Sequence, residues 1–517
     1  MPGLSGEVID RLAPDRAIKN IQLDIRSDFI LAPHFNAIFN RASDDLWSEL
    51  EGKLRSGNYN PVIPLTMNVP KEGWFSRPGS ILAPLDRLAY QLISDDLMPK
   101  LEEALDRNRT FSHFPSPHAD EYFISNSETW EKFQERVQAI CSENRYVIKA
   151  DISHYFERLP QHHLINLMNA AGAKPETTKL LEEILLAFQQ RNSFGIIQGV
   201  YPSDLFGNFY LSELDAHCEL MGLDSARYVD DFYIGLDSLQ AARFGMVQLV
   251  EHLRKDGLHL NEGKSKIFQS EHLLKEETEI DRAFDEIRTS IWGDLNSNSI
   301  HPYGFEADWE AEEDESKDEM RDKDIDTTAA INLLHEINRF SSKSDQIERF
   351  VLPLLGAAGS DAGLDHVLTE LANKPHNSRI YFSYIKKFAP NDSSLRNKLE
   401  KLATSDKLTS DYQKMFLLAA MMTCPTVDRS MVNKALTWMR DPQIAKETRA
   451  MCAIFCARKG SANQKRTVRT QYENEASDYV RSAILYASRH FKGAERRTCK
   501  IAWGGHSTVN SLIAKTI

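Results

Sequence analysis

The chain has 517 residues, of which 42% are hydrophobic and 26% are charged, and it carries a net charge of −13. Because single hydrophobic cores stop growing at about 250–300 residues, this length excludes one small domain and indicates at least two. The chain has no run of 18 apolar residues, no apolar leader and no CxxC pair, so we expect a cytoplasmic protein with no membrane span, secretory signal or disulfide framework.

The first half of the chain alternates strand and helix patterns. Residues 146–152 and 226–236 are rich in Val, Ile, Tyr and Phe, which is typical of β-strands. Amphipathic helical patterns at 175–190, 203–221 and 238–255 lie between and beside them. The mixture predicts an α+β domain.

Both predicted strands carry aspartates at positions suited to metal binding. Asp151 stands at the end of the first strand, and Asp230 and Asp231 interrupt an apolar run, which predicts a tight β-hairpin. Adjacent carboxylates in an apolar segment are costly unless cations compensate their charge. Phosphoryl transfer by polymerases uses two Mg²⁺ ions about 3.5–4 Å apart, bound by carboxylate oxygens. We therefore predict that Asp151, Asp230 and Asp231 meet around two Mg²⁺ ions, for which Mn²⁺ can substitute.

A strongly acidic segment divides the chain. Residues 306–326 contain 12 acidic and 3 basic residues, a net charge of −9, so the remainder carries only −4. Such a composition is typical of a solvated linker. We expect a first domain at 1–290, the acidic linker at 291–326 and an α-helical domain at 327–517.

The region after the acidic segment shows one helical pattern after another. Apolar residues recur at spacings of three and four, and Pro, Gly, Asn, Asp and Ser interrupt them roughly every 15–20 residues. The predicted helices are 327–340, 344–357, 361–373, 377–388, 394–404, 408–422, 428–439, 443–458, 475–491 and 495–503. A HEAT-like solenoid of paired helices is the expected architecture, with an irregular helical bundle as the alternative.

Five motifs in the first half follow the order found in reverse transcriptases. Val69-Pro70-Lys71, Arg77-Pro78 and Asp86-Arg87 together resemble the fingers pattern of that family. The segments that resemble its motifs A, B, C and D are 151–156 (DISHYF), 198–203 (QGVYPS), 228–231 (YVDD) and 257–265 (GLHLNEGKS). The resemblance covers residues 65–270. It implies an α+β reverse-transcriptase palm and fingers, as in right-hand polymerases, followed here by the all-α HEAT-like domain.

The resemblance implies roles for the matching residues. Asp151 and Asp230 would bind both metals, with Asp231 supporting them and the Ile152 carbonyl as a further ligand. Lys264 would protonate the leaving pyrophosphate. The implied nucleotide-binding residues are Lys71 and Arg77 at the triphosphate, Gln198 and Gly199 in the pocket, and Phe156 as a steric barrier to the ribose 2′-hydroxyl, so that dNTPs are preferred.

Two departures from the usual reverse-transcriptase pattern indicate which group of the family the chain resembles. Motif B continues as QGVYPSD, and a long helical region stands where a short basic thumb is usual. This architecture resembles bacterial abortive-infection and defence-associated reverse transcriptases of the AbiK type. That resemblance implies antiphage defence and DNA synthesis, in some members without a template. It also implies priming by a protein tyrosine, with the DNA product covalently attached, and assembly into homo-oligomeric trimers or hexamers.

Several questions stay open in the sequence. The chain has 16 tyrosines, and no pattern singles out a priming residue; Tyr472, Tyr479 and Tyr486 stand at helical spacing. A retron-like enzyme that copies a companion non-coding RNA is one alternative function. A catalytically vestigial scaffold that binds a partner protein through the helical domain is another.

Overall fold

The structure, a computed structural model, describes residues 5–118, 121–274, 300–301, 304–305, 327–405 and 407–517. The chain forms two compact units that alternate along the sequence. Unit 1 comprises Met1–Asp24, Trp47–Pro64 and Leu85–Arg288, and unit 2 comprises Ile25–Leu46, Leu65–Pro84 and Thr289–Ile517. The predicted acidic linker at 291–326 lies outside the described residues, apart from the two-stranded pair β7 (Ile300–His301) and β8 (Gly304–Phe305). The predicted domain boundaries stay a prediction.

A four-stranded antiparallel sheet forms the centre of unit 1. Its strands are β3 (Tyr146–Asp151), β4 (Asp224–Tyr228), β5 (Asp231–Leu236) and β6 (Lys266–Gln269). The strand order is β4-β5-β3-β6, so β3 and β5 lie side by side in the middle. The strands predicted at 146–152 and 226–236 are confirmed, and the second is the hairpin that the Asp pair indicated.

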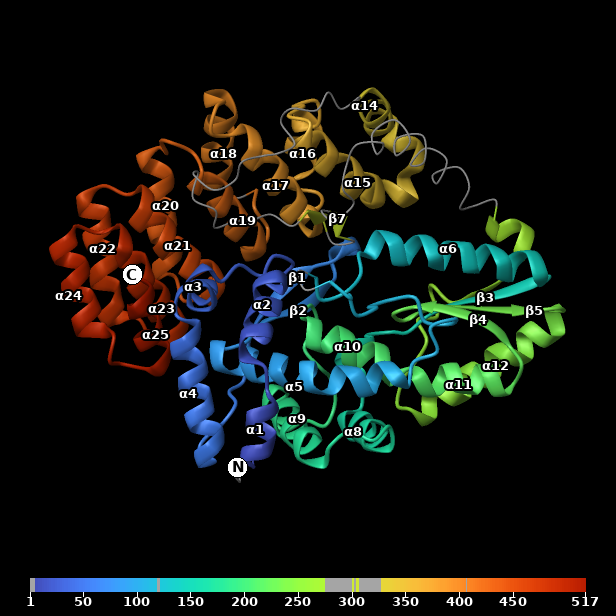
Figure 1. Cartoon of the computed structure of the whole chain (residues 1–517). Helices are drawn as coiled ribbons and strands as arrows, with labels where there is room; N and C mark the ends of the chain where they lie inside the picture. The colour runs from blue at the N-terminus through green and yellow to red at the C-terminus, as the bar shows by residue number, and fades with distance from the viewer. Residues whose placement is uncertain (1–4, 119–120, 275–299, 302–303, 306–326, 406) are drawn as a thin grey trace. The chain divides into compact units, whose positions relative to one another are not determined.

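Helices cover both faces of this sheet. On one face lies α6 (Asn126–Glu143), whose Phe133 and Ile140 belong to the same buried cluster as Val147 and Tyr233 of the strands. On the other face lies α12 (Leu239–Lys255), in which a Cβ at Gly245 would meet Ile148 at 3.3 Å. Figure 1 shows α6 on one side of the strands and α12 on the other. Each fully buried Val, Ile or Phe side chain contributes roughly 1.5–3 kcal/mol to stability. This packing therefore holds the ends of the strands in place.

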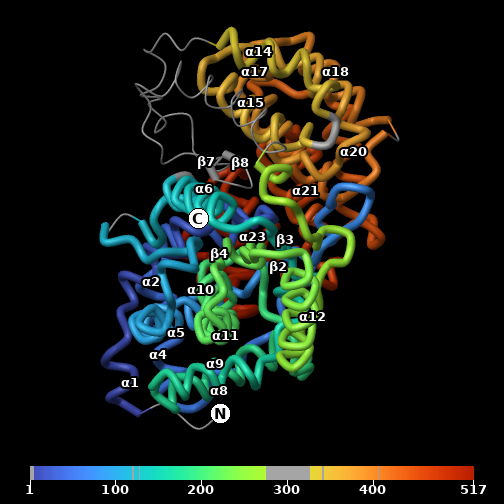
Figure 2. Tube along the Cα trace, turned by 90° about the vertical axis from the view of Figure 1, so that its right-hand side faces the viewer, coloured from blue at the N-terminus to red at the C-terminus, as the bar shows by residue number. Residues whose placement is uncertain are grey.

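Unit 1 contains further helices in the part of the chain that the structure describes. They are α1 (Gly6–Arg11), α2 (Pro14–Asp24), α4 (Ser43–Ser56), α5 (Pro84–Glu103), α7 (Tyr155–Arg158), α8 (Gln161–Ala170), α9 (Pro175–Phe188), α10 (Tyr201–Tyr210) and α11 (Ser212–Leu220). Figure 2 shows α8 and α9 lying side by side. The helical patterns predicted at 175–190, 203–221 and 238–255 are confirmed as α9, the pair α10 and α11, and α12.

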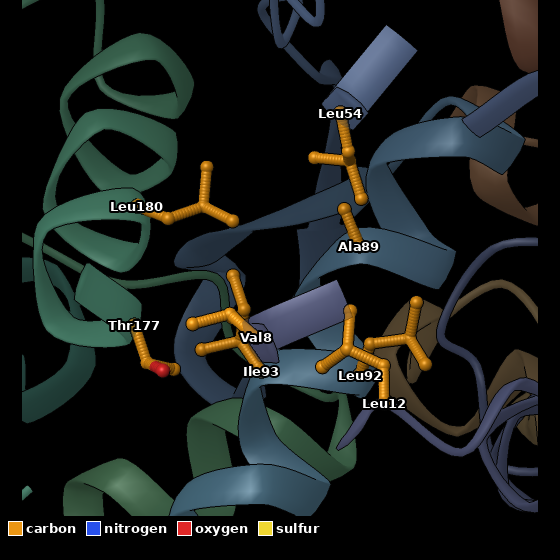
Figure 3. A pocket seen from close by; sticks show the side chains of 8 residues that line it. All are labelled: Val8, Leu12, Leu54, Ala89, Leu92, Ile93, Thr177 and Leu180. Carbon is orange, nitrogen blue, oxygen red and sulfur yellow. The ribbon is translucent and has the colours of Figure 1, made fainter. Parts of the chain in front are cut away.

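A small apolar cavity lies among the helices of unit 1. Figure 3 shows its lining, which is Val8, Leu12, Leu54, Ala89, Leu92, Ile93, Thr177 and Leu180. Its volume is about 10 Å³, which is close to the limit for one water molecule, and its walls offer almost no polar partner. The cavity is therefore a packing gap and not a site for a nucleotide.

Unit 2 contains a second β-hairpin and one early helix. The hairpin pairs β1 (Leu65–Pro70) with β2 (Ser76–Ile81) in antiparallel register, and α3 (Pro33–Arg41) precedes it. A short 3-10 turn, Glu72–Trp74, forms its tip. Lys71 and Arg77 stand on the two sides of this tip.

From residue 327 onward, the described part of unit 2 is an all-α array, as predicted. Its helices are α14 (Thr328–His335), α15 (Ser344–Ala357), α16 (Leu364–Glu370), α17 (Ser378–Phe388), α18 (Ser393–Thr404), α19 (Asp411–Met422), α20 (Arg429–Arg440), α21 (Lys446–Lys459), α22 (Ala462–Asn474), α23 (Asp478–Ala487), α24 (Gly493–Trp503) and α25 (Thr508–Thr516). Figure 1 shows them from yellow to red. The described part of the chain contains no helix long and apolar enough to cross a membrane.

The array is built in two layers. From α15 to α25, each odd-numbered helix packs on the next odd-numbered one, and α18, α20 and α22 pack on one another in the same way. This alternation is the layering that a solenoid of helix pairs requires. Its assignment as a HEAT-type repeat stays a prediction.

Candidate active site

Asp151 and Asp231 face each other across the central strand pair. Asp151 is the last residue of β3, Asp231 is the first residue of β5, and the two are direct Cα partners in the antiparallel register. Side chains of directly opposed residues project from the same face with Cβ atoms about 4.5–5.5 Å apart. Asp230 precedes Asp231 in the β4–β5 turn. The structure thus brings the three predicted metal ligands to one end of the sheet.

The turn that carries Asp230 is held in an uncommon conformation. Val229 has a φ of 56°, in the left-handed region that a β-branched residue rarely adopts. Its N–H donates to Ser112 Oγ at 3.0 Å, and its carbonyl accepts from Arg227 Nη1 at 3.3 Å. A conformation of this kind costs on the order of 1–3 kcal/mol, so neighbouring contacts must impose it.

A buried arginine provides much of that constraint. The side chain of Arg227 is fully buried, and its Nε donates to both carboxylate oxygens of Asp215, at 3.0 and 2.8 Å. Its Nη1 donates to Asn208 Oδ1 at 2.7 Å. The sequence reasoning assigned no role to this residue, although an arginine inside an apolar strand requires a buried partner.

The segment after α12 supports Asp151 from the other side. The N–H of Asn261 donates to the carbonyl of Asp151 at 2.8 Å, and the N–H of Asp151 donates to Ser265 Oγ at 3.2 Å. Ile152 forms an isolated bridge with Leu260. Lys264 extends from this segment, and its Nζ lies 3.3 Å from Asp151 Oδ2. The predicted acid is therefore beside the predicted metal ligands.

The electrostatics of the three carboxylates favour a divalent cation. Burial raises the pKa of Asp230 to about 7, and the neighbouring charges of Asp231 and Asp151 add to the effect. Burial and Asp151 also raise the pKa of Asp231. A cluster of partly buried like charges with only oxygen donors fits Mg²⁺ or Mn²⁺, because hard cations prefer carboxylate oxygens. The residues present therefore fit the two predicted ions.

Residues 69–292 match the protein family described as reverse transcriptase (RNA-dependent DNA polymerase). The chain contains a reverse transcriptase domain. The matched range begins just before Lys71 and extends beyond Lys264, so every residue assigned from the motifs lies inside it. A comparison with curated proteins found no match.

Two similar solved structures are telomerases. For apo telomerase from Candida tropicalis, the TM-score is 0.33 and the identity 10%, over 91% of this chain and 73% of that chain. For telomerase from Candida albicans in complex with the TWJ fragment of telomeric RNA, the TM-score is 0.33 and the identity 12%, over 76% of this chain and 65% of that chain.

Within the reverse transcriptase domain, the motif B residues enter α10. Gly199 has a φ of +84°, which a residue with a Cβ rarely adopts, and Gln198 beside it is half-buried. Phe156 of α7 packs against α10, where a Cβ at Gly207 would stand 2.9 Å from its ring. The half-buried Phe156 ring is thus held by contact with a glycine that leaves room for it.

The electrostatic neighbours of Lys264 keep it charged. Although partial burial alone lowers the pKa of Lys264, the adjacent Asp151 carboxylate raises it above its ordinary value. The ammonium group therefore carries a proton at the edge of the carboxylate cluster. This is what a proton donor requires, and its role toward pyrophosphate stays a prediction.

The two predicted triphosphate ligands belong to unit 2. The N–H of Lys71 donates to the Phe75 carbonyl at 2.8 Å, which closes the tip of the β1–β2 hairpin. The guanidinium carbon of Arg77 lies 4.3 Å from the centre of the Phe29 ring. Their approach to a nucleotide at the aspartates stays a prediction.

Proposed function

We propose that this reverse transcriptase domain polymerises dNTPs through two Mg²⁺ ions held by Asp151, Asp230 and Asp231, with Mn²⁺ as a substitute. The observation that carries the proposal is the direct pairing of Asp151 with Asp231 across β3 and β5, with Asp230 in the adjoining turn. The ions would supply an activated attacking hydroxyl and neutralise the charge of the triphosphate.

The chain's own residues position the reactants. The backbone around Asp151 is fixed by Asn261 and Ser265, which holds its carboxylate toward the hairpin turn. Lys264 holds a proton beside the carboxylates, where pyrophosphate would leave. Phe156, braced against Gly207, would meet the 2′-hydroxyl of a ribonucleotide and select the deoxyribose. We assign the Ile152 carbonyl to the metal ions as a further ligand. Gln198 and Gly199 would line the pocket for the nucleotide.

We further propose that the protein acts in antiphage defence, as an enzyme of the AbiK type. The combination of these motifs with a two-layer helical array in one chain supports this assignment. The extended array also offers surface for a homo-oligomer, a trimer or hexamer by analogy. DNA synthesis in this proposal is untemplated and begins on a tyrosine.

The structure bears on which tyrosine could serve as the primer. Tyr472, Tyr479 and Tyr486 are all buried. The hydroxyl of Tyr472 shares a hydrogen bond with His506 Nδ1 at 2.8 Å, and its ring stacks on Trp503. These three residues pack the helical array, so we place the priming hydroxyl elsewhere.

The deciding experiment supplies the purified chain with Mg²⁺ and labelled dNTPs in the absence of template. Label that stays with the polypeptide on a denaturing gel supports protein-primed synthesis. Asp151→Asn and Asp230→Asn should abolish the label, whereas Asp237→Asn, an exposed carboxylate beyond the far end of β5, should retain it. Equal labelling of all four proteins would refute the assignment of the aspartates.

The retron-like alternative is RNA-templated copying of a companion non-coding RNA. The family's description as an RNA-dependent DNA polymerase favours it. It requires that a defined RNA co-purifies with the protein and that labelled DNA appears only when this RNA is present. Sequencing the co-purified nucleic acid separates the two functions. The scaffold alternative requires that Asp230→Asn leaves phage resistance intact.

A further inference from the structure

A second group of possible metal ligands lies in unit 1, on three helices apart from the catalytic turn. His163 stands on α8, Glu213 on α11, and Asp256 at the end of α12. Nε2 of His163 lies 3.1 Å from Oε2 of Glu213. One donor atom from each of the three residues lies within 4.8 Å of the other two. Three elements distant in sequence thus present one imidazole and two carboxylates to a common point.

A further imidazole lies beside Asp256. Nε2 of His252 lies 3.5 Å from Oδ2 of Asp256 and is buried without a hydrogen-bond partner. The His252 ring stacks on His217, with ring centres 4.5 Å apart. A buried imidazole nitrogen without a hydrogen bond is costly unless another group binds it. His252 can therefore complete the coordination around Asp256.

We propose that His163, Glu213 and Asp256, joined by His252, bind a transition-metal ion of the Zn²⁺ class. Imidazole with carboxylate suits Zn²⁺, whereas Mg²⁺ prefers a purely oxygen environment. Zinc bonds of about 2.0–2.2 Å place tetrahedral donor atoms roughly 3.3–3.6 Å apart. The donor atoms of His163 and Glu213 are 3.1 Å apart, and those of all three residues lie within 4.8 Å of one another, which is close to this spacing.

The backbone around these ligands is already fixed. The hydroxyl of Tyr210 donates to the carbonyl of Asp256 at 2.7 Å. The next residue, Gly257, has a φ of +74°, and a Cβ there would stand 2.8 Å from Pro160, the residue immediately before α8. These contacts hold the end of α12 against the end of α10 and the start of α8. A site whose ligands are positioned in advance binds its ion at a lower entropic cost.

The proposed ion would also restrain the segment that supports Asp151. Asp256 directly precedes the segment 257–265, which bonds to Asp151 through Asn261 and carries Lys264. An ion that ties the end of α12 to α8 and α11 would therefore restrain this segment at its beginning. We assign the ion a structural role in placing Lys264, distinct from the two ions of catalysis.

The test uses the full chain, stripped with a chelator and then supplied with Zn²⁺ or with excess Mg²⁺. Zn²⁺ at about 100 times its dissociation constant should raise the Tm by roughly 5–10 °C, because a ligand of the native state stabilises it. Mg²⁺ should not reproduce this rise. His163→Gln and Asp256→Asn should each weaken the binding of Zn²⁺ by more than about 10-fold.

The matched control is His162→Gln. His162 is the neighbouring residue on α8, and its Nδ1 lies 2.7 Å from Glu182 of α9, but this pair belongs to no three-ligand group in the part of the chain that the structure describes. The control should keep the full response to Zn²⁺. Co²⁺ in place of Zn²⁺ should give visible absorption bands that disappear in the His163 variant and persist in the control.

Two outcomes would overturn the proposal. One is a wild-type protein that neither gains stability nor shows the Co²⁺ bands. The other is an equal response of the His163 and His162 variants, which would move the ion to other carboxylates. If His163→Gln fails to fold, Glu213→Gln replaces it, because that side chain is 48% exposed and its substitution leaves the packing intact.

Discussion

Arg227 donates two hydrogen bonds from Nε to Asp215, and the exposed fractions of the two side chains are 0% and 5%. The same guanidinium reaches Asn208 and the Val229 carbonyl. A buried ion pair therefore stabilises the turn that carries Asp230. Asp215 also accepts from Thr110 Oγ1 at 2.8 Å, so its charge is satisfied from a second direction.

Replacing Arg227 by Met should destabilise the chain by about 3–5 kcal/mol, because Asp215 would remain as a buried charge without its partner. Urea unfolding followed by circular dichroism measures the loss. Arg243→Met, on the exposed side of α12, is the control and should change stability by less than about 0.5 kcal/mol. A second substitution, Asp215→Leu in the Arg227→Met protein, should recover part of the loss. Identical midpoints for Arg227→Met and Arg243→Met would show that the ion pair contributes nothing.

Phe156→Ala should relax the choice between deoxyribose and ribose. Removing the ring opens space beside Gly207, so a 2′-hydroxyl no longer meets an obstacle, and we expect discrimination against rNTPs to fall by about 10-fold or more. The measurement is the ratio of kcat/KM for a dNTP and the matching rNTP. Phe194, which is 53% exposed, supplies the control Phe194→Ala, whose ratio should equal that of the parent. An unchanged ratio in Phe156→Ala would remove the steric role.

Gly199→Ala should lower both stability and polymerase activity. At a φ of +84° an alanine is strained by roughly 1–2 kcal/mol, and the peptide leading into α10 must shift to relieve it. Gly52→Ala is the matched control, since this glycine lies in α4 with nothing within 4 Å of an added Cβ. There, alanine should be neutral or stabilising by up to about 1 kcal/mol. Comparing Tm and dNTP incorporation in both variants distinguishes strain from a general effect of adding a methyl group.

The sequence could predict the parts of the site that depend on local pattern. The alternation of Val, Ile and Tyr around Asp151 and Asp231 is a strand signal, and antiparallel pairing of two such strands brings the carboxylates together. The partners of Arg227 could not be predicted in this way, because Asp215 and Asn208 lie on helices whose placement depends on tertiary packing. The group of His163, Glu213 and Asp256 could not be predicted for the same reason, since its successive members are 50 and 43 residues apart along the chain.

The spacing of apolar residues did not predict every helix of the C-terminal region. The helices α22 and α25 lie outside the predicted set. In α22 only Gln464, Val468 and Tyr472 are buried, so its apolar stripe is too thin to give a pattern. Residues 25–46 and 65–84 also belong to the same compact unit as the C-terminal helices. No composition shift marks these two segments, because their contacts are formed with residues hundreds of positions later.

A buried histidine makes the stability of unit 2 depend on pH. His34 of α3 is fully buried between the rings of Phe35 and Tyr479, each with a centre 4.6 Å away, and burial lowers its pKa to about 3. The unfolded chain binds a proton at the ordinary pKa of about 6.5, whereas the folded chain does not. Between these values the unfolded state therefore holds more protons, and stability should fall as the pH drops from about 6.5 toward 3.

The change in the free energy of unfolding between neutral pH and a pH below 3 is on the order of 5 kcal/mol. About 2 kcal/mol of it should be lost by pH 5. His34→Phe removes the titrating group and keeps an aromatic ring, so the stability of this variant should depend less steeply on pH. Hydrogen exchange of the amides in α3 and α25, which contact each other, measures the local free energy of opening at pH 7 and pH 5. His118→Gln, an exposed histidine, should retain the parent's slope. Equal slopes for the parent and His34→Phe would mean that His34 is not the group responsible.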